Sequence, residues 1–394
     1  MKEPRRRSGE MGGPDPIDSA LEAGSGATTA GRLRFFFHSR AALGLAPAAA
    51  PALIFVPLGI VLGPAGLGLL SEEALAHLDT VVSLGLAALG VFIGLGLEMG
   101  RAERRLLAAA SVESLVTVAL VAFTTAFLLA SWDMRPEVPA AVLALALGIV
   151  ASASSAGAAE EWHDGPHHLA TRIADLDDVA PILIGGFVIV AAAHGSFAPS
   201  AVVLTAVTIA VGVAAAIAGW LLFERASGEA ERAVFVAGSV LLLAGCAAYL
   251  GLSPLLAGLA AGVCWGLLPG QADHIVREDL RKFQHPLVVV LLVVAGATLS
   301  GSSAGVWLLA PFLCFRLAGK LIGGWFASRL APGLTPSHLG SYLIAPGVLG
   351  IAFALNFLQV SPSRAGEALL FAAAVGSLVN EAIALAAMPP ARRG

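Results

Sequence analysis

Long apolar runs separated by short polar segments fill the chain from Pro51 to Met388. A helix that crosses a bilayer needs about 20 predominantly apolar residues, within a range of roughly 17 to 25. This criterion predicts about twelve spans, with approximate limits 52–70, 79–100, 106–131, 137–159, 172–194, 199–224, 231–249, 253–268, 284–300, 304–328, 337–358 and 366–388. The pattern therefore predicts an all-α membrane protein, because a helix satisfies its own backbone hydrogen bonds in lipid.

Two of the predicted spans carry an interruption. In the fourth, small and hydroxyl residues replace bulky apolar ones, and Ser152, Ser154 and Ser155 lie among them. In the eleventh, Pro346 and Gly347 stand in mid-span, where proline removes a helical hydrogen bond. Interrupted helices at corresponding places in two halves of a chain indicate a transport site, where freed carbonyls and hydroxyls bind an ion. A tight contact between helices through small residues explains the fourth span equally well.

The order of spans and interruptions suggests an internal repeat. Spans 3–5 correspond to spans 10–12, and an offset of seven spans, being odd, reverses the direction in which the second copy crosses the membrane. We therefore predict inverted repeats in which two discontinuous helices, spans 4 and 11, cross each other. This prediction rests on hydropathy and helix breakers, since the residues themselves do not repeat.

Composition supports a membrane protein and divides the chain into two parts. Hydrophobic residues make up 57% of the chain and charged residues only 13%, whereas a soluble domain is about one quarter charged. Residues 1–45 are rich in Arg, Gly, Ser and Pro and are predicted to form a disordered cytoplasmic tail. Residues 46–390 form the predicted transmembrane domain. The sequence has no phosphate-binding motif and no catalytic triad order, so we expect no enzyme, no resident cofactor and no nucleic-acid partner.

Basic residues test the predicted topology. With the N-terminus inside, only Arg135 and Arg364 fall in outside loops, which fits an even number of spans with both termini in the cytoplasm. The inside segments carry Lys2, Arg5, Arg6, Arg7, Arg32, Arg34, Arg40, Arg101, Arg104, Arg105, Arg172, Arg225, Arg232, Arg277, Arg281, Lys282, Arg329, Arg392 and Arg393. Arg316 and Lys320 remain, and both lie within the tenth span. A cation within the bilayer costs several kcal/mol unless it faces water or a counter-charge.

The fifth span supplies carboxylates that could provide this counter-charge. Asp175, Asp177 and Asp178 lie within its first two turns. In one interpretation Asp175 caps the helix and the adjacent pair sits at the cytoplasmic interface without a transport role. In the other, one aspartate pairs with Lys320 and the second binds a cation or a proton. Arg316 lies one turn before Lys320 and is an alternative counter-ion.

Six segments, taken together and in order, resemble a known family. They are G-I-V-L-G-P-A-G-L-G at 59–68, V-F-I-G-L-G-L-E at 91–98, S-A-S-S at 152–155, the double aspartate at 177–178, the lysine segment 316–324, and V-N-E at 379–381. From about Pro51 onward, the chain resembles the second group of monovalent cation–proton antiporters, which includes bacterial sodium–proton exchangers. It departs from some relatives by lacking an acidic residue in the eleventh span and an additional N-terminal helix.

The resemblance implies specific roles. Asp178 would bind the cation and the proton in competition, Asp177 would form a salt bridge with Lys320, and the double aspartate is associated with electrogenic exchange. The cation would be Na⁺, with Li⁺ or K⁺ as alternatives. A core of spans 3–5 and 10–12 would move against a dimerisation scaffold of spans 1, 2 and 7–9. The protein would then be a homodimer in the inner membrane of a prokaryote.

Several features remain open at this stage. Glu381 either binds the ion or pairs near a helix end. Glu160, Glu161, His163, Asp164, His167 and His168 form either a solvated polar loop or a pH-sensing or metal-binding cluster. A sodium-coupled organic-anion symporter of the same architecture and a potassium efflux protein are the alternative functions. The first needs a larger polar cavity, and the second usually carries a ligand-sensing cytoplasmic domain.

Overall fold

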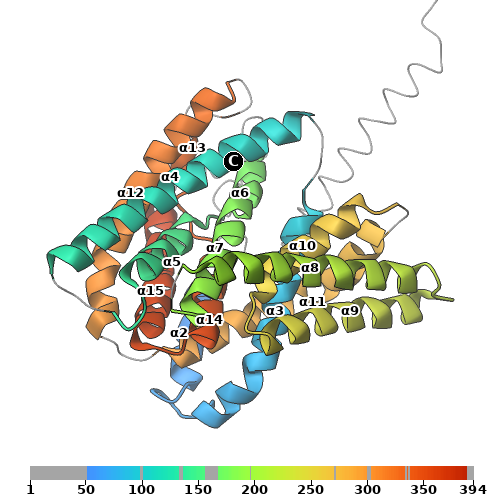
Figure 1. Cartoon of the computed structure of the whole chain (residues 1–394). Helices are drawn as coiled ribbons and strands as arrows, with labels where there is room; N and C mark the ends of the chain where they lie inside the picture. The colour runs from blue at the N-terminus through green and yellow to red at the C-terminus, as the bar shows by residue number, and fades with distance from the viewer. Residues whose placement is uncertain are drawn as a thin grey trace, which may run out of the picture. The chain divides into compact units, whose positions relative to one another are not determined.

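The computed structural model describes residues 51–97, 101–132, 136–155, 167–195, 197–269, 272–299, 303–332, 335 and 338–387. The predicted tail over 1–45 lies outside these residues. The described part is helical, which confirms the all-α prediction (Figure 1). The helices are α2 (Pro51–Leu62), α3 (Glu72–Leu95), α4 (Arg101–Ser131), α5 (Ala140–Ser152), α6 (His167–Leu176), α7 (Val179–Ala193), α8 (Pro199–Phe223), α9 (Glu229–Tyr249), α10 (Pro254–Leu267), α11 (Ala272–Thr298), α12 (Ser303–Leu330), α13 (Leu339–Tyr342), α14 (Val348–Val360) and α15 (Arg364–Ala387).

Within the described ranges, eight helical segments are long and apolar enough to cross a membrane, with α6 and α7 counted as one. The helices α2, α5, α10 and α14 are shorter and apolar. The chain is therefore a multi-pass membrane protein, while the count of twelve spans stays a prediction.

Helix ends differ from the hydropathy limits where polar residues or helix breakers intervene. α11 begins at Ala272, well before the expected position 284, because its first three turns are polar and escape a hydropathy criterion. α2 ends at Leu62, where Gly63 and Pro64 follow, and α5 ends at Ser152. The fifth span is divided by a turn at Asp177 and Asp178.

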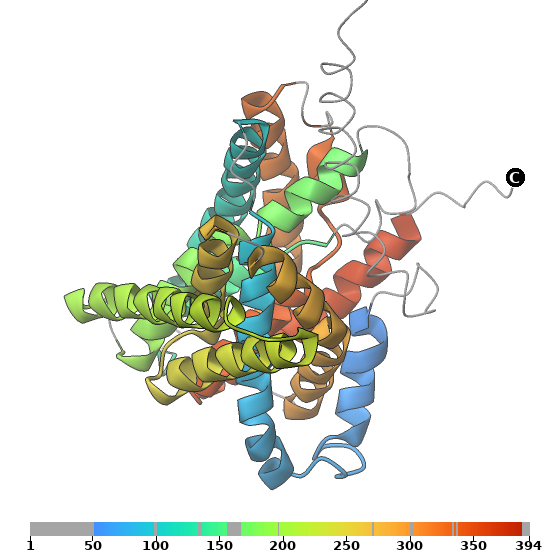
Figure 2. The same cartoon turned by 90° about the vertical axis from the view of Figure 1, so that its right-hand side faces the viewer.

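The helices pack in two sets. In the first, α12 packs on α4 and α15, α5 on α4 and α7, and α14 on α15 and α5. In the second, α3 packs on α10 and α11, α8 on α9 and α10, and α2 lies along α11 (Figure 2). A separate apolar cluster that includes Trp265 and Leu243 lies among α3 and α8–α11. The polar site lies in the first set.

Aromatic residues on α12 give the depth of its charged residues. Trp307 and Trp325 are 63% and 48% exposed, and tryptophan favours the membrane–water interface. They are separated by about 27 Å along the helix, close to the thickness of a bilayer core. Arg316 lies midway between them in sequence, and Lys320 lies about 8 Å from the level of Trp325. Both cations are therefore placed at membrane depth.

The two predicted interruptions lie against each other. After α5 the chain is extended, and Ser154 forms an isolated antiparallel bridge with Pro346, between α13 and α14. The N–H of Ser155 donates to the carbonyl of Ala345 at 2.9 Å, and the N–H of Gly347 donates to that of Ala153 at 3.3 Å. A Cβ atom at Gly347 would lie 2.5 Å from the carbonyl oxygen of Ser154, so this approach requires glycine. Whether the two segments belong to an inverted repeat stays a prediction.

Candidate functional site

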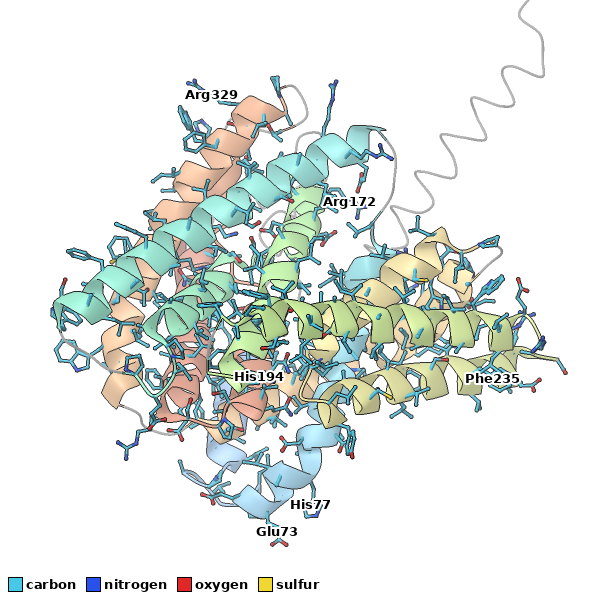
Figure 3. The ribbon with its side chains drawn as sticks, viewed as in Figure 1. Glu73, His77, Arg172, His194, Phe235 and Arg329 are labelled. Carbon is cyan, nitrogen blue, oxygen red and sulfur yellow. The ribbon has the colours of Figure 1, made fainter. Side chains whose placement is uncertain are left out.

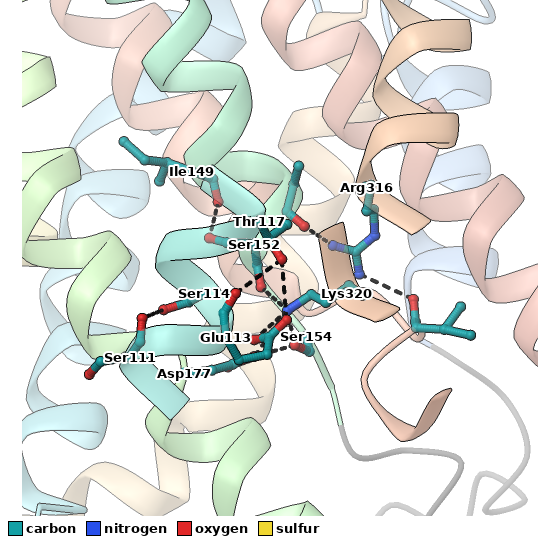
Figure 4. A network of polar contacts seen from close by, with 12 residues as sticks. Ser111, Glu113, Ser114, Thr117, Ile149, Ser152, Ser154, Asp177, Arg316 and Lys320 are labelled. Carbon is teal, nitrogen blue, oxygen red and sulfur yellow. Dashed lines mark hydrogen bonds and ion pairs between the residues drawn. The ribbon is translucent and has the colours of Figure 1, made fainter. Parts of the chain in front are cut away.

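The ammonium group of Lys320 is the centre of a buried polar cluster (Figure 4). Its Nζ atom lies 3.2 Å from Oδ2 of Asp177 and 3.2 Å from Oε2 of Glu113, and the three side chains are fully buried. Asp177 comes from the turn between α6 and α7, Glu113 from α4, and Lys320 from α12. One cation is thus shared by two carboxylates from different helices.

The interrupted fourth span supplies further oxygen atoms to the same ammonium group. Lys320 Nζ donates to Oγ of Ser154 at 2.7 Å and also to the carbonyl oxygen of Ser152. The Ser154 hydroxyl in turn donates to Oδ2 of Asp177. The carbonyl of Ser152 is available because α5 ends there and the chain is extended at Ala153. The break in α5 therefore delivers a carbonyl and a hydroxyl to the charged centre.

Small residues allow α12 to approach α4 closely enough for these contacts. A Cβ atom at Gly323 would lie 2.6 Å from the carbonyl oxygen of Glu113, and one at Gly319 would lie 3.0 Å from the Cα atom of Thr117. These glycines flank Lys320 by one and three positions, so the backbones meet where the side chains pair. Glycine at a helix–helix contact in lipid is a common means of close approach.

Asp177 and Asp178 lie in the turn that divides the fifth span. Asp178 is the N-cap residue of α7, yet its side chain makes no capping hydrogen bond. Oδ1 of Asp177 and Oδ1 of Asp178 are both buried without a hydrogen-bond partner among the described residues. The turn thus presents two buried carboxylate oxygens that are open to a proton or a cation. Hard monovalent and divalent cations prefer oxygen ligands of this kind.

Arg316 has a different environment from Lys320. Its guanidinium group is buried and donates to the carbonyl oxygen of Ala151 and, at 3.1 Å, to that of Ile344. These carbonyls belong to the two interrupted regions, near the end of α5 and between α13 and α14. Arg316 therefore ties the two interruptions together, and the geometry favours Lys320 over Arg316 as the direct counter-charge of Asp177.

The other predicted site residues are distributed around this centre. Ser155, Pro346 and Gly347 contribute through their backbones to the pairing of the two extended segments. Asp175, on α6, is close enough to Asp178 for their charges to repel each other. Glu381, on α15, is 7% exposed, and its Oε2 atom is buried without a hydrogen-bond partner among the described residues.

Part of the predicted polar loop cannot be assigned a geometry. Glu160, Glu161, His163 and Asp164 lie outside the described residues, as does Glu98 of the second-span motif. Within the residues that the structure does describe, there is no group of three or more His, Cys, Asp or Glu side chains arranged to hold a metal ion.

Glu113 is the residue of this centre that sequence reasoning missed. It lies in the third predicted span, and an acidic residue within an apolar run is itself a signal of function. Because the positive-inside rule concerns only Lys and Arg, it does not point to this carboxylate. The hydroxyl of Thr117, one turn later on α4, lies 3.2 Å from both the Oε1 atom and the backbone carbonyl oxygen of Glu113 and shares its hydrogen bond between them. With Glu113, the described centre holds three carboxylates near two cations.

The chain is similar to known proteins in sequence and in fold. Residues 43–388 match the sequence profile of the family described as "Sodium/hydrogen exchanger, transmembrane". Among solved structures, the fold is similar to that of the sodium proton antiporter MjNhaP1 from Methanocaldococcus jannaschii, with a TM-score of 0.62 and 14% sequence identity. The match covers 85% of this chain and 90% of that one. A comparison with curated protein sequences gave no match.

Proposed function

The chain belongs to the sodium/hydrogen exchanger family, and on that premise we propose that it exchanges a monovalent cation for protons by competition at Asp178. The observation that carries this proposal is the buried turn of two carboxylates, in which Asp177 is held by Lys320 while Oδ1 of Asp178 has no hydrogen-bond partner among the described residues. A proton and a cation would neutralise the same carboxylate, so each would exclude the other. Competition at one site yields exchange without a separate gate.

We propose Na⁺ as the transported cation. The description of the family names sodium, and the structurally similar archaeal protein is a sodium proton antiporter. The available ligands are hard carboxylate, hydroxyl and carbonyl oxygens, which also suit Li⁺ and K⁺. The double aspartate supports electrogenic exchange, in which more than one proton moves for each cation.

The proposed movement requires two parts that slide against each other. We assign α4–α7 and α12–α15 to a mobile core, and α2, α3 and α9–α11 to a scaffold that dimerises. The pairing of Ser154 with Pro346 supports the view that spans 4 and 11 are crossed discontinuous helices of an inverted repeat within twelve spans. The apolar cluster shared by α3 and α9–α11, to which α8 also contributes, supports a rigid scaffold.

The distribution of charged residues supports an orientation in the membrane. Figure 3 shows Arg172 and Arg329 toward one end of the molecule, with Glu73 and His77 at the opposite end. The positive-inside rule would place the arginine end in the cytoplasm. We therefore propose a prokaryotic inner-membrane protein with both termini inside.

The decisive experiment uses purified protein in proteoliposomes with an internal pH dye, to which Na⁺, Li⁺ and K⁺ are added in turn. Asp178→Asn should abolish cation-driven pH changes while size-exclusion behaviour and melting stay as in the wild type. Asp273→Asn, at the start of α11, is the matched control and should exchange normally. Wild-type exchange in the Asp178→Asn protein would refute the assignment. Uptake of an organic anion together with Na⁺, without proton counterflow, would instead identify a symporter, and K⁺ flux without proton counterflow an efflux protein.

A further inference from the structure

We propose that Glu113 is a second proton-carrying group of the exchange site, sharing one proton with Asp177 while Lys320 stays charged throughout the cycle. This inference rests on the proposed cation–proton exchange and assigns the additional proton of an electrogenic cycle to a carboxylate on α4.

The geometry of the charged centre is symmetrical about Lys320. Oε2 of Glu113 and Oδ2 of Asp177 each lie 3.2 Å from Nζ, and none of the three side chains is exposed to solvent. Among the described residues, Lys320 is the only cation that contacts these two carboxylates, because Arg316 donates to backbone carbonyls, and one ammonium group balances only one of them. The remaining negative charge has no access to water, and in a low-dielectric site it is costly unless a proton or a cation neutralises it. Two such carboxylates hold a proton jointly, as one coupled unit.

Lys320 is poorly suited to be the group that releases a proton. Its ammonium group has three N–H donors, and four oxygen atoms surround it, from Glu113, Asp177, Ser154 and Ser152. A neutral amine would keep only two donors and would leave buried acceptors without partners. Leaving buried polar atoms unpaired is unfavourable, so the carboxylates are the groups that change protonation.

The neighbouring charges support this assignment. Arg316, on the same helix as Lys320, donates to the carbonyls of Ala151 and Ile344. Thr117 on α4 donates to Oε1 of Glu113. Asp177 and Asp175, on the turn and on α6, both add negative charge near Asp178. Glu113 is thus the carboxylate that contacts Lys320 from α4, on a different element from the turn that carries Asp177 and Asp178.

The cycle that follows balances in charge and protons. When a cation binds at Asp178, Asp177 turns one oxygen toward it, and Glu113 keeps Lys320 paired. The positive charge of the cation neutralises the excess carboxylate charge that the shared proton had neutralised. The shared proton therefore leaves to water together with the proton displaced from Asp178. Two positive charges leave for the one that enters, and exchange therefore moves charge across the membrane.

The test measures charge movement per cation in proteoliposomes, from the Na⁺ gradient at which flux reverses at set membrane potentials. In the wild type, that gradient should shift with potential. Glu113→Gln preserves size and an acceptor oxygen for Lys320 but removes the shared proton. Exchange should therefore continue, and the Na⁺ gradient at which flux reverses should no longer depend on membrane potential. Glu103→Gln, near the start of the same helix, is the matched control and should retain the response. A response unchanged in Glu113→Gln would overturn the inference.

A measurement on the wild type covers the case in which Glu113→Gln does not fold. Infrared difference spectra on adding Na⁺ should show the loss of two protonated carboxyl groups if Glu113 and Asp177 share the second proton. The loss of one carboxyl band with release of two protons would assign the second proton to Lys320 and overturn the inference. Wild-type exchange that is insensitive to potential would also overturn it while leaving the exchange function intact. Absence of any wild-type exchange would refute the proposed function itself.

Discussion

Two helix pairs, α3–α10 and α4–α12, pack in the same way but differ in function. In both, glycine brings the backbones together: a Cβ atom at Gly258 of α10 would lie 2.1 Å from the carbonyl of Ala87, and one at Gly323 of α12 would lie 2.6 Å from that of Glu113. The contact of α3 with α10 is otherwise apolar. The contact of α4 with α12 encloses the fully buried ion pair of Glu113 and Lys320.

The difference between these pairs separates stability from function. Close glycine packing stabilises helix contacts in lipid, where the hydrophobic effect does not draw helices together. A buried ion pair adds little or nothing to this, because desolvation offsets the attraction of its charges. The cost of burying Glu113 and Lys320 is therefore better explained by ion transport than by folding, whereas the contact of α3 with α10 needs only a structural explanation.

The largest effect is expected when the charged contact loses its cation. Lys320→Ala leaves Glu113 and Asp177 buried without a counter-charge, which should lower stability by about 3–5 kcal/mol and disturb the coupling of cation and proton flux. Thermal melting in detergent and charge movement per cation measure the two effects. Lys282→Ala is the matched control, since Lys282 pairs with Asp279 at 2.8 Å but is 63% exposed, and its melting should change little. Unchanged melting and coupling in Lys320→Ala would remove Lys320 from the scheme.

A smaller effect is expected when the apolar contact is forced apart. Gly258→Ala should lower stability by about 1–3 kcal/mol, because the new methyl group overlaps the backbone of α3. Gly266→Ala, on the same helix with open space around it, should be neutral or slightly stabilising, since alanine favours helix formation. Exchange per folded molecule should persist in both. Loss of exchange in folded Gly258→Ala would show that the two helix pairs are not functionally separate.

The smallest effect concerns a single hydrogen bond beside the charged contact. Thr117→Val preserves shape and removes a hydroxyl that lies 3.2 Å from both Oε1 and the backbone carbonyl oxygen of Glu113, which should cost about 1 kcal/mol. Thr124→Val, on the same helix, removes a hydroxyl that bonds only to backbone carbonyls of its own helix. Thr117→Val should alter the pH dependence of exchange and Thr124→Val should not. Identical pH profiles would show that Thr117 does not tune the Glu113 carboxylate.

Much of this organisation was readable in the sequence because it depends on local pattern. Runs of apolar residues predicted where helices lie, and Pro346, Gly347 and the serines near Ser154 predicted where helical hydrogen bonding stops. The resemblance to cation–proton antiporters was confirmed by the family comparison. The polar start of α11 was missed, since hydropathy detects only the part of a helix that lies in lipid.

The sequence by itself determined that this is a helical membrane protein with charged residues within its spans. Composition and the length of apolar runs show directly whether a segment lies in lipid or in water. Only the tertiary structure decided which charges meet. Glu113 and Lys320 are 207 positions apart, and their contact depends on how closely α4 and α12 pack. Likewise, the target of Arg316 is a pair of carbonyls that become available only because two distant helices end side by side. Such pairings depend on distances across the bundle, which no local pattern encodes.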